Sequence, residues 1–166
     1  MTIIKHNEQR VGILFDAQNM YHSAKNLYKK KVNFKAVLKT AVADRKLVRA
    51  IAYAIHTETG EEKTFCDALV KLGIEVKTKD LQIFAGGMKK GDWDVGITID
   101  AVRLSKSLDV IILISGDGDF VPLIEYLKNQ GVQTEVMAFG KSASLKLKEI
   151  ADDFIDLGEN QKLYLL

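Results

Sequence analysis

The sequence predicts an α/β protein with a parallel or mostly parallel central sheet flanked by helices. Short runs rich in Val, Ile and Leu recur along the chain, and segments with helical periodicity separate them. Such runs are typical of strands that are covered on both faces, and their alternation with helices favours right-handed crossovers between parallel strands. The chain has 166 residues, so we expect a single domain over residues 1–166.

The predicted strands are short apolar runs, and the first of them is followed directly by Asp16. The strands are expected at Val11–Phe15, Val48–Ile55, Ile74–Lys77, Val110–Ile114, Val132–Ala138 and Phe154–Leu157. Runs of this length favour strands over helices.

The predicted helices lie between these strands. They are expected at Met20–Lys30, Phe34–Ala43, Glu61–Leu72, Trp93–Leu108, Phe120–Asn129 and Leu145–Ala151. Gly73 and Gly131 follow two of them and suit the position after a helix end. A loop is predicted at Gly86, Gly87 and Gly91, and Glu159–Leu166 gives no prediction.

Composition excludes several classes of protein. No apolar run approaches the ~20 residues that a membrane-spanning helix needs, and residues 1–10 lack the apolar segment of a signal peptide. The single cysteine, Cys66, excludes an internal disulfide framework and a Cys-rich zinc site. His6, His22 and His56 show no metal-ligand spacing. We therefore expect a cytoplasmic protein with no membrane association.

The distribution of charge is more informative than its sum. The net charge is +2, from 24 basic and 22 acidic residues. Lys29, Lys30 and Lys31 form one basic run, and Lys89 and Lys90 form another. A basic rim around an acidic centre is compatible with a polyanion held over a metal site, although each run alone fits a solvated loop or helix face equally well.

Acidic residues follow two of the predicted strands. Asp16 ends the first, and Asp117 and Asp119 come shortly after Val110–Ile114. In open α/β sheets, sites form beyond the carboxyl ends of the strands, so we expect these residues to lie at one edge of the sheet. Further candidates near these positions are Asn19, Asp92, Asp94 and Asp100.

Carboxylates that meet in this way need a cation. Two of them about 4 Å apart repel by roughly 4 kcal/mol at an effective dielectric constant near 20. A divalent cation such as Mg²⁺ removes the repulsion, lowers the pKa of a bound water and neutralises a phosphate transition state. A phosphodiester is the natural substrate of such a site. Gly116 and Gly118, beside the acids, allow a positive φ angle and a close backbone approach.

Each acid also fits an ordinary structural role. Caps and turns are common where a strand leads into a helix, and an acid near a helix start favours the macrodipole. These roles suit Asp16, Asn19, Asp92, Asp94, Asp117 and Asp119. Asp100 lies within a predicted helix, where an ion pair with Arg103 is its structural alternative. The combination of positions, rather than any one of them, indicates a site.

The predicted helix Trp93–Leu108 carries two apolar stripes, so we expect it to be largely enclosed. The stripes are Ile97, Ala101, Leu104 and Leu108 on one side, and Val95, Ile99 and Val102 on the other. We expect Trp93 to pack in the core rather than to stack on a nucleic-acid base.

Three segments resemble the motifs of NYN domains. Ile13–Asn19 is similar to their opening motif, in which a strand ends in Asp and Asn follows three positions later. Lys90–Ala101 resembles their central Lys-Gly-x-Asp-Val segment with one extra residue, so either Asp92 or Asp94 matches the acid, and the Val that follows favours Asp94. Ser115–Leu123 is close to the most recognisable motif of the family.

The resemblance is nearest to the LabA-like branch and covers a core of about residues 11–157. It implies a three-layer PIN-like (Rossmann-like) fold and cleavage of RNA that depends on Mg²⁺ or Mn²⁺. The implied catalytic and metal-binding residues are Asp16, Asp94, Asp117 and Asp119, with Asp100 as a peripheral metal residue. The residues expected to contact substrate are Asn19, Ser115, Lys89 and Lys90.

We therefore expect a metal-dependent endoribonuclease, with a homodimer as an open possibility. The alternative is a non-catalytic PIN-like regulatory module that binds RNA or a protein partner. A third possibility is phosphoryl transfer through Asp16. A phosphatase of the haloacid-dehalogenase type would place a second Asp where this sequence has Gln18, and no P-loop or nucleophile elbow is present.

Overall fold

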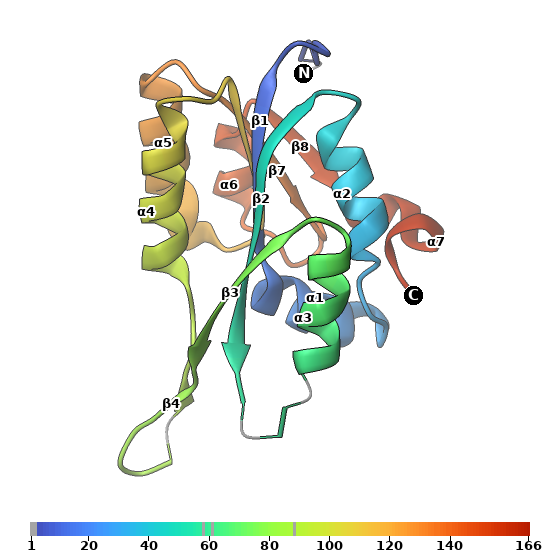
Figure 1. The fold of residues 1–166 in the computed structure, drawn as a ribbon, viewed down its shortest axis with the longest axis vertical. Coiled ribbons are helices and arrows are strands. Elements are labelled where there is room, and N and C mark those ends of the chain that lie inside the picture. The colour runs from blue at the N-terminus through green and yellow to red at the C-terminus, as the bar shows by residue number, and fades with distance from the viewer. Residues whose placement is uncertain (1–2, 58, 61, 88) are drawn as a thin grey trace.

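The structure, a computed structural model, describes residues 3–57, 59–60, 62–87 and 89–166, with only the backbone of Lys89 and Lys90 described. A six-stranded sheet runs through its centre (Figure 1). The strands of the sheet are β1 (Arg10–Asp16), β2 (Lys46–His56), β3 (Glu75–Asp80), β6 (Val110–Ile114), β7 (Gln133–Ala138) and β8 (Asp153–Asp156). Their order is β3-β2-β1-β6-β7-β8, and every neighbouring pair is parallel. The predicted parallel sheet is confirmed.

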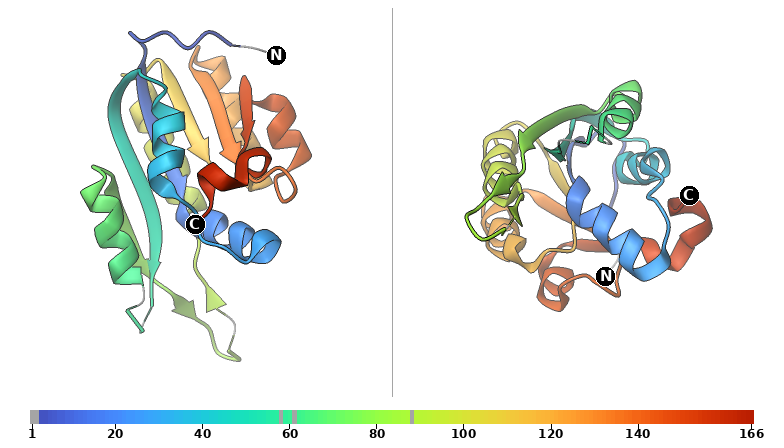
Figure 2. Two further views of the ribbon diagram at one scale, coloured as in Figure 1. Left: turned by 90° about the vertical axis from the view of Figure 1, so that its right-hand side faces the viewer. Right: turned by 90° about the horizontal axis from the view of Figure 1, so that it is seen from below.

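Helices cover both faces of the sheet, as Figure 2 shows from two further sides. One face packs against α1 (Ala17–Tyr28), α2 (Phe34–Val42), α3 (Glu62–Lys71) and α7 (Gln161–Tyr164). The other packs against α4 (Asp94–Ser105), α5 (Val121–Asn129) and α6 (Leu145–Ile150). Along β1, Ile13 and Phe15 belong to the first core and Leu14 to the second, which confirms the three-layer architecture. Within the described residues, every helix is too short or too polar to cross a membrane.

The order of the strands changes direction beside β1. From β1 the chain passes to β2 and β3 on one side, and later to β6, β7 and β8 on the other. Phe15 of β1 is paired with Ile114 of β6, so the residues that follow them, Asp16 and Ser115, lie side by side at the same edge of the sheet. This switch point is where open α/β sheets bind their ligands.

The bounds of most elements lie within a few residues of those predicted. Helix α1 begins at Ala17 rather than at Met20, because the Asp16 side chain caps its first turn. Glu61, the predicted start of the third helix, lies outside the described residues. The C-terminal segment, which gave no prediction, forms α7 and buries Leu165 in the first core.

The glycine-rich segment before α4 is a hairpin rather than a simple loop. It consists of two short antiparallel strands, β4 (Gln82–Ile83) and β5 (Lys89–Lys90), and extends away from the sheet beyond β3 (Figure 1). Gly86 and Gly87 lie between the strands with φ angles of +95° and +83°. Two-residue strands are too short to leave an apolar pattern, so the sequence predicted only the loop.

Helix α4 is not enclosed, and this expectation was wrong. Ile97 and Ala101 of its first stripe are fully buried, but Val95 and Ile99 of the second are 72% and 44% exposed. The helix lies in an outer layer, so only the face toward the sheet is covered by the described elements. Two apolar stripes in a sequence do not show how many neighbours a helix will have.

A buried ion pair lies toward the amino ends of the strands, away from the switch point. Arg45 and Glu135 are 5% and 1% exposed. The guanidinium donates to both carboxylate oxygens of Glu135, at 2.7 and 3.0 Å, and also to the Ala41 carbonyl oxygen at 2.8 Å. Burial by itself raises the pKa of Glu135, but hydrogen bonds from Arg45 and Gln133 outweigh it, so the pKa lies below its ordinary value.

We expect Arg45→Met to lower the free energy of unfolding by about 3 kcal/mol, because Glu135 stays buried without its guanidinium partner and keeps, among the described cationic side chains, only the longer contact to Lys5 at 3.6 Å. The double variant Arg45→Met/Glu135→Leu should recover most of this stability, because no unpaired charge remains. Urea denaturation of both variants measures the two free energies. Equal destabilisation in the single and double variants would contradict the explanation.

Candidate metal centre

Asp16 both ends β1 and caps α1. Its Oδ1 accepts a hydrogen bond from the Asn19 backbone N–H at 3.3 Å, and its Oδ2 accepts one from the Ser115 hydroxyl at 2.9 Å. Burial raises the pKa of the Asp16 carboxyl group, these hydrogen bonds oppose the rise, and the charges of Asp117 and Asp92 add to it. The cap that we considered as the structural alternative is present, and the same side chain lines a pocket.

The loop after β6 carries the second acid and is fastened to the end of β1. The Ser115 hydroxyl oxygen accepts a hydrogen bond from the Asp117 backbone N–H at 3.2 Å, and Asn19 Oδ1 accepts one from the Gly116 N–H at 3.0 Å. Asp117 Oδ1 in turn accepts one from the Asp119 N–H at 2.9 Å. Asn19 and Ser115, which we expected to contact substrate, thus hold the two strand ends together.

Gly116 and Gly118 permit close packing rather than a left-handed backbone. Neither has a positive φ angle, contrary to one part of the expectation. A Cβ atom at Gly116 would lie 3.0 Å from Ala143 Cα, and one at Gly118 would lie 2.9 Å from Ser144 Oγ. The acidic loop therefore packs directly against the segment that follows β7.

Asp94, the first residue of α4, is placed by its neighbour. The Trp93 indole N–H donates to the Ala54 carbonyl oxygen of β2 at 2.9 Å, and its ring packs on Tyr53 with 5.3 Å between the centroids. The Asp94 backbone N–H donates to Asp92 Oδ1 at 3.2 Å. Trp93 packs against the core, as expected, and fixes the start of the helix that carries Asp94.

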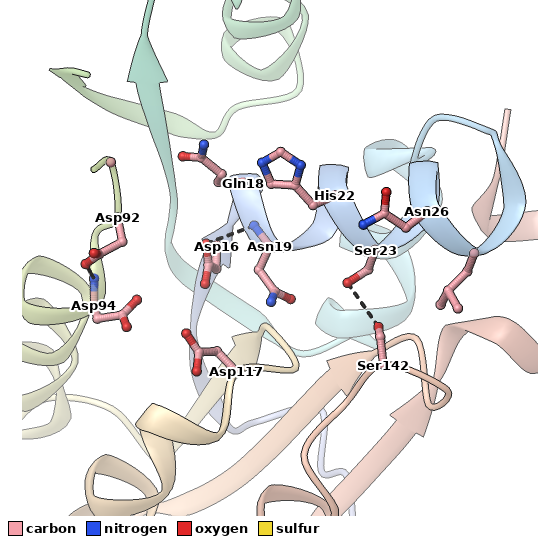
Figure 3. A pocket seen from close by; sticks show the side chains of 12 residues that line it. Asp16, Gln18, Asn19, His22, Ser23, Asn26, Asp92, Asp94, Asp117 and Ser142 are labelled. Atoms are coloured by element: carbon pink, nitrogen blue, oxygen red, sulfur yellow. Dashed lines mark hydrogen bonds between the residues drawn. The ribbon is translucent and has the colours of Figure 1, made fainter. Parts of the chain in front are cut away.

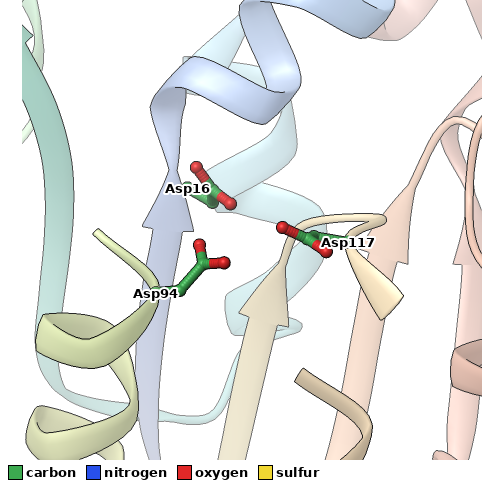
Figure 4. A group of neighbouring side chains, drawn as sticks. All are labelled: Asp16, Asp94 and Asp117. Atoms are coloured by element: carbon green, nitrogen blue, oxygen red, sulfur yellow. The ribbon is translucent and has the colours of Figure 1, made fainter. Parts of the chain in front are cut away.

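Three carboxylates meet at this edge of the sheet. Oxygens of Asp16, Asp94 and Asp117 lie within 4.8 Å of one another, and Figure 4 shows the three side chains converging from β1, α4 and the loop after β6. None of the ion pairs found among the described side chains involves any of these three acids. Their charges therefore have no lysine or arginine partner in the part of the chain that the structure describes.

The group fits a hard divalent cation. Burial raises the pKa of Asp94 to about 7, and the nearby charges of Asp117, Asp92 and Asp16 add to this effect. Near neutral pH the group needs either a proton or a cation to offset its repulsion. Mg²⁺ and Mn²⁺ prefer oxygen ligands of this kind, so Asp16, Asp94 and Asp117 are the residues that could hold one.

Asp100 lies apart from the group and has its own partners. Its Oδ2 accepts hydrogen bonds from the Lys77 ammonium group and from the Tyr53 hydroxyl, both at 2.7 Å. Burial by itself raises the pKa of Asp100, but these hydrogen bonds outweigh it and lower the pKa. Lys77, rather than Arg103, is therefore the main ionic partner of this carboxylate.

The remaining predicted site residues are Asp119 and the two lysines of β5, Lys89 and Lys90. Asp119 is exposed, and its charge raises the pKa of Asp94 although its carboxylate is not one of the three that meet. The side chains of Lys89 and Lys90 lie outside the described residues. The structure thus brings together three of the four expected catalytic acids.

A pocket of about 290 Å³ covers the acids and continues along α1 (Figure 3). Its lining also includes polar side chains that are not among the predicted site residues: Gln18, His22, Ser23, Asn26 and Ser142. On α1 these residues recur at intervals of three and four, which places them on one side of a helix. The same spacing occurs on any solvated helix face, so the sequence offered no reason to select them.

The fold and the site together define the class of protein: a parallel α/β/α protein with a candidate divalent-cation site at the switch point of its sheet. The chain belongs to the NYN domain family, whose sequence model matches residues 10–158. The resemblance seen in the three motifs is thereby confirmed.

Relatives are found in bacteria and archaea. The chain is 30% identical over 161 residues to the low amplitude and bright protein LabA of Synechococcus elongatus, covering 90% of this chain and 84% of LabA. It is 26% identical over 161 residues to an uncharacterized protein of Methanocaldococcus jannaschii, covering 96% of this chain and 60% of that protein. The crystal structure of a protein of unknown function from Vibrio parahaemolyticus has a TM-score of 0.88 and 31% identity, covering 99% of this chain and 100% of that one.

We expect Asp94→Asn to stabilise the metal-free protein at pH 8 and to have little effect near pH 4. The folded protein raises the pKa of Asp94 from 3.8 to about 7, so ionisation of this one group lowers the stability of the wild type as the pH rises between these values. The gain at pH 8 should be about 1–2 kcal/mol, since solvent screens this partly exposed group.

Thermal melts in EDTA at both pH values measure this effect. Asp67→Asn, which makes the same change at an exposed position of α3, is the matched control and should not change stability at either pH. A destabilised Asp94→Asn variant at pH 8 would show that the three carboxylates do not repel one another.

Proposed function

We propose that this protein is a metal-dependent ribonuclease that hydrolyses phosphodiester bonds within RNA, with Mg²⁺ or Mn²⁺ held by Asp16, Asp94 and Asp117. The observation that supports this proposal is the convergence of three carboxylates within 4.8 Å, without a lysine or arginine partner among the described side chains. Membership of the NYN family favours a nuclease and favours RNA as the polyanion.

The residues of the site divide into ligands and residues that position them. Asp16 is oriented by the Ser115 hydroxyl and the Asn19 backbone, and the same two residues fasten the loop that carries Asp117. The Asp94 carboxyl group, whose pKa is raised, would release its proton when a cation binds to it.

The cation supplies the chemistry of the reaction. A bound Mg²⁺ or Mn²⁺ would lower the pKa of the attacking water and offset the charge that develops on the phosphate. The protein then needs no covalent intermediate, and its own part is to hold the acids and the phosphate in place. Asp119 would act at the exposed rim of the site. Lys89 and Lys90 remain predicted contacts to the RNA backbone.

The second candidate is a non-catalytic module of the same fold that binds RNA or a protein. Two observations favour it: Asp119 is not among the three acids that meet, and Asp100 is already paired with Lys77. Three carboxylates hold a cation less tightly than the larger set that the sequence suggested.

We expect Asp117→Asn to reduce RNA cleavage by more than about 100-fold, beyond the 10- to 100-fold typical of residues that only orient a ligand. The assay follows end-labelled RNA and single-stranded DNA in the presence of Mn²⁺. Asp67→Asn on α3 serves again as the control for an Asp-to-Asn change outside the pocket. Wild-type cleavage by Asp117→Asn would contradict the assignment.

We expect Mn²⁺ to raise the melting temperature of the wild type, because the three carboxylates meet only in the folded protein. Asp16→Asn and Asp117→Asn should show no such rise, because each removes one of the three carboxylates. A free concentration of 100 times Kd would add about 2.7 kcal/mol to the free energy of unfolding. Differential scanning fluorimetry with a series of Mn²⁺ concentrations gives the measurement. No shift, together with no cleavage, would favour the non-catalytic module.

A further inference from the structure

One stretch of the chain beside the metal centre carries a strong positive charge. Residues 17–43 contain six lysines and no acidic residue, although the net charge of the whole chain is only +2. The stretch begins directly after Asp16, forms α1 and α2, and includes the run Lys29–Lys31. The metal centre makes no use of these lysines.

A groove connects the acids to this basic stretch. Gln18, His22 and Asn26 follow one another along α1 at intervals of four residues, and all three line the pocket (Figure 3). Ser142, from the segment after β7, also lines the pocket, and its hydroxyl donates to the hydroxyl of Ser23 on α1 at 3.0 Å. These five residues define the α1 groove. It extends along a helix of 12 residues, which is roughly 18 Å long.

The lysines lie beside the groove and at its far end. Neither Lys25 nor Lys29 lines the pocket, but each follows a lining residue, His22 or Asn26, by three positions and so lies beside the groove. Lys29 is the C-cap residue of α1, and two further exposed lysines follow it directly. Acids therefore lie at one end of the groove, neutral polar side chains line it, and lysines lie beyond its other end.

We propose that the α1 groove binds a single strand of RNA, which runs from the metal centre to the lysines at the end of the helix. The inference rests on the proposed ribonuclease function and identifies where the substrate lies beyond the phosphate that is cut. Lys25 and Lys29–Lys31 neutralise phosphates, while the neutral side chains between them contact riboses and bases.

The chemistry of the groove favours a single strand over a duplex. The exposed His22 ring lines the groove, and the exposed Tyr21 ring lies beside it, edge to face with 5.4 Å between the centroids and with Lys25 Nζ 5.6 Å from the Tyr21 centroid. Unstacked bases can stack on such rings and hydrogen-bond to amide and hydroxyl groups, whereas a duplex covers these surfaces of its bases.

Gln18 adds a further reason to expect a hydroxyl-bearing strand. Its Oε1 atom is buried and has no hydrogen-bond partner among the described residues. Because an unpaired buried oxygen is unfavourable, a small rotation of this side chain toward a ribose hydroxyl would gain a hydrogen bond without breaking one at that atom.

Charge reversal at the basic end tests the proposal. Binding of a fluorescently labelled single-stranded oligoribonucleotide is followed by anisotropy in Ca²⁺, with gels to show that the RNA stays intact. We expect Lys29→Glu/Lys30→Glu to raise Kd by at least about 10-fold. The slope of log Kd against log salt should fall by roughly 0.7 for each phosphate that the variant no longer neutralises.

The matched control is Lys71→Glu/Lys106→Glu, which changes the net charge equally. These exposed lysines lie at the ends of α3 and α4 that are remote from the metal centre. The control should bind RNA like the wild type. Equal weakening in both double variants would show that only net charge matters and would overturn the proposal, as would the absence of RNA binding by the wild type.

A neutral double variant tests the middle of the groove. We expect His22→Ala/Asn26→Ala to raise Kd by roughly 5-fold or more while leaving the salt slope unchanged, because it removes base and ribose contacts rather than phosphate contacts. Duplex RNA should compete more weakly than the single strand. Equal competition by the duplex would contradict the single-strand assignment.

These experiments test the groove assignment separately from the ribonuclease assignment. If the wild type binds single-stranded RNA in this manner but never cleaves it, the ribonuclease assignment fails and the groove assignment stands. If the wild type cleaves RNA while Lys29→Glu/Lys30→Glu binds and cleaves like the control, the groove assignment fails and the ribonuclease assignment stands.

Discussion

Repulsion among Asp16, Asp94 and Asp117 is the constraint on which the functional interpretation depends. Each carboxylate alone has an ordinary local role at a strand end or a helix start, and only their approach to within 4.8 Å creates a repulsion that a proton or a cation must offset. That approach follows from the strand order, because β1 and β6 are neighbours at the point where the sheet changes direction. The repulsion is therefore a property of the topology rather than of any one motif.

The surrounding structure holds this unfavourable arrangement in place. Ser115 and Asn19 tie the end of β1 to the loop after β6 by hydrogen bonds, and Trp93 ties the start of α4 to β2. These contacts stabilise the positions of the three acids without neutralising them. The Arg45–Glu135 pair, in contrast, is a buried charge cluster with its partners in place, and it lies where no ligand is needed.

Charge is arranged along one direction of the molecule. The acids lie at one end of the α1 groove, neutral polar side chains line it, and Lys29–Lys31 follow in sequence directly after the helix that forms it. A polyanion is attracted to the basic end and is tolerated at the acidic end only when a cation is bound. In the proposed function this arrangement would couple RNA binding to the metal, and it would let a chain with little net charge recognise a highly charged substrate.

The sequence by itself determined the strands, the parallel sheet and the acids that end two strands, because apolar runs and their spacing depend on local chemistry. It also determined the family, through three motifs in order. Only the tertiary structure decided which acids meet: Asp94 joins Asp16 and Asp117, whereas Asp100 pairs with Lys77 on a neighbouring strand. The tertiary structure alone also decided that one face of α4 is exposed and that polar residues of α1 line a groove. Partners distant in sequence decide such contacts, and no local pattern records them.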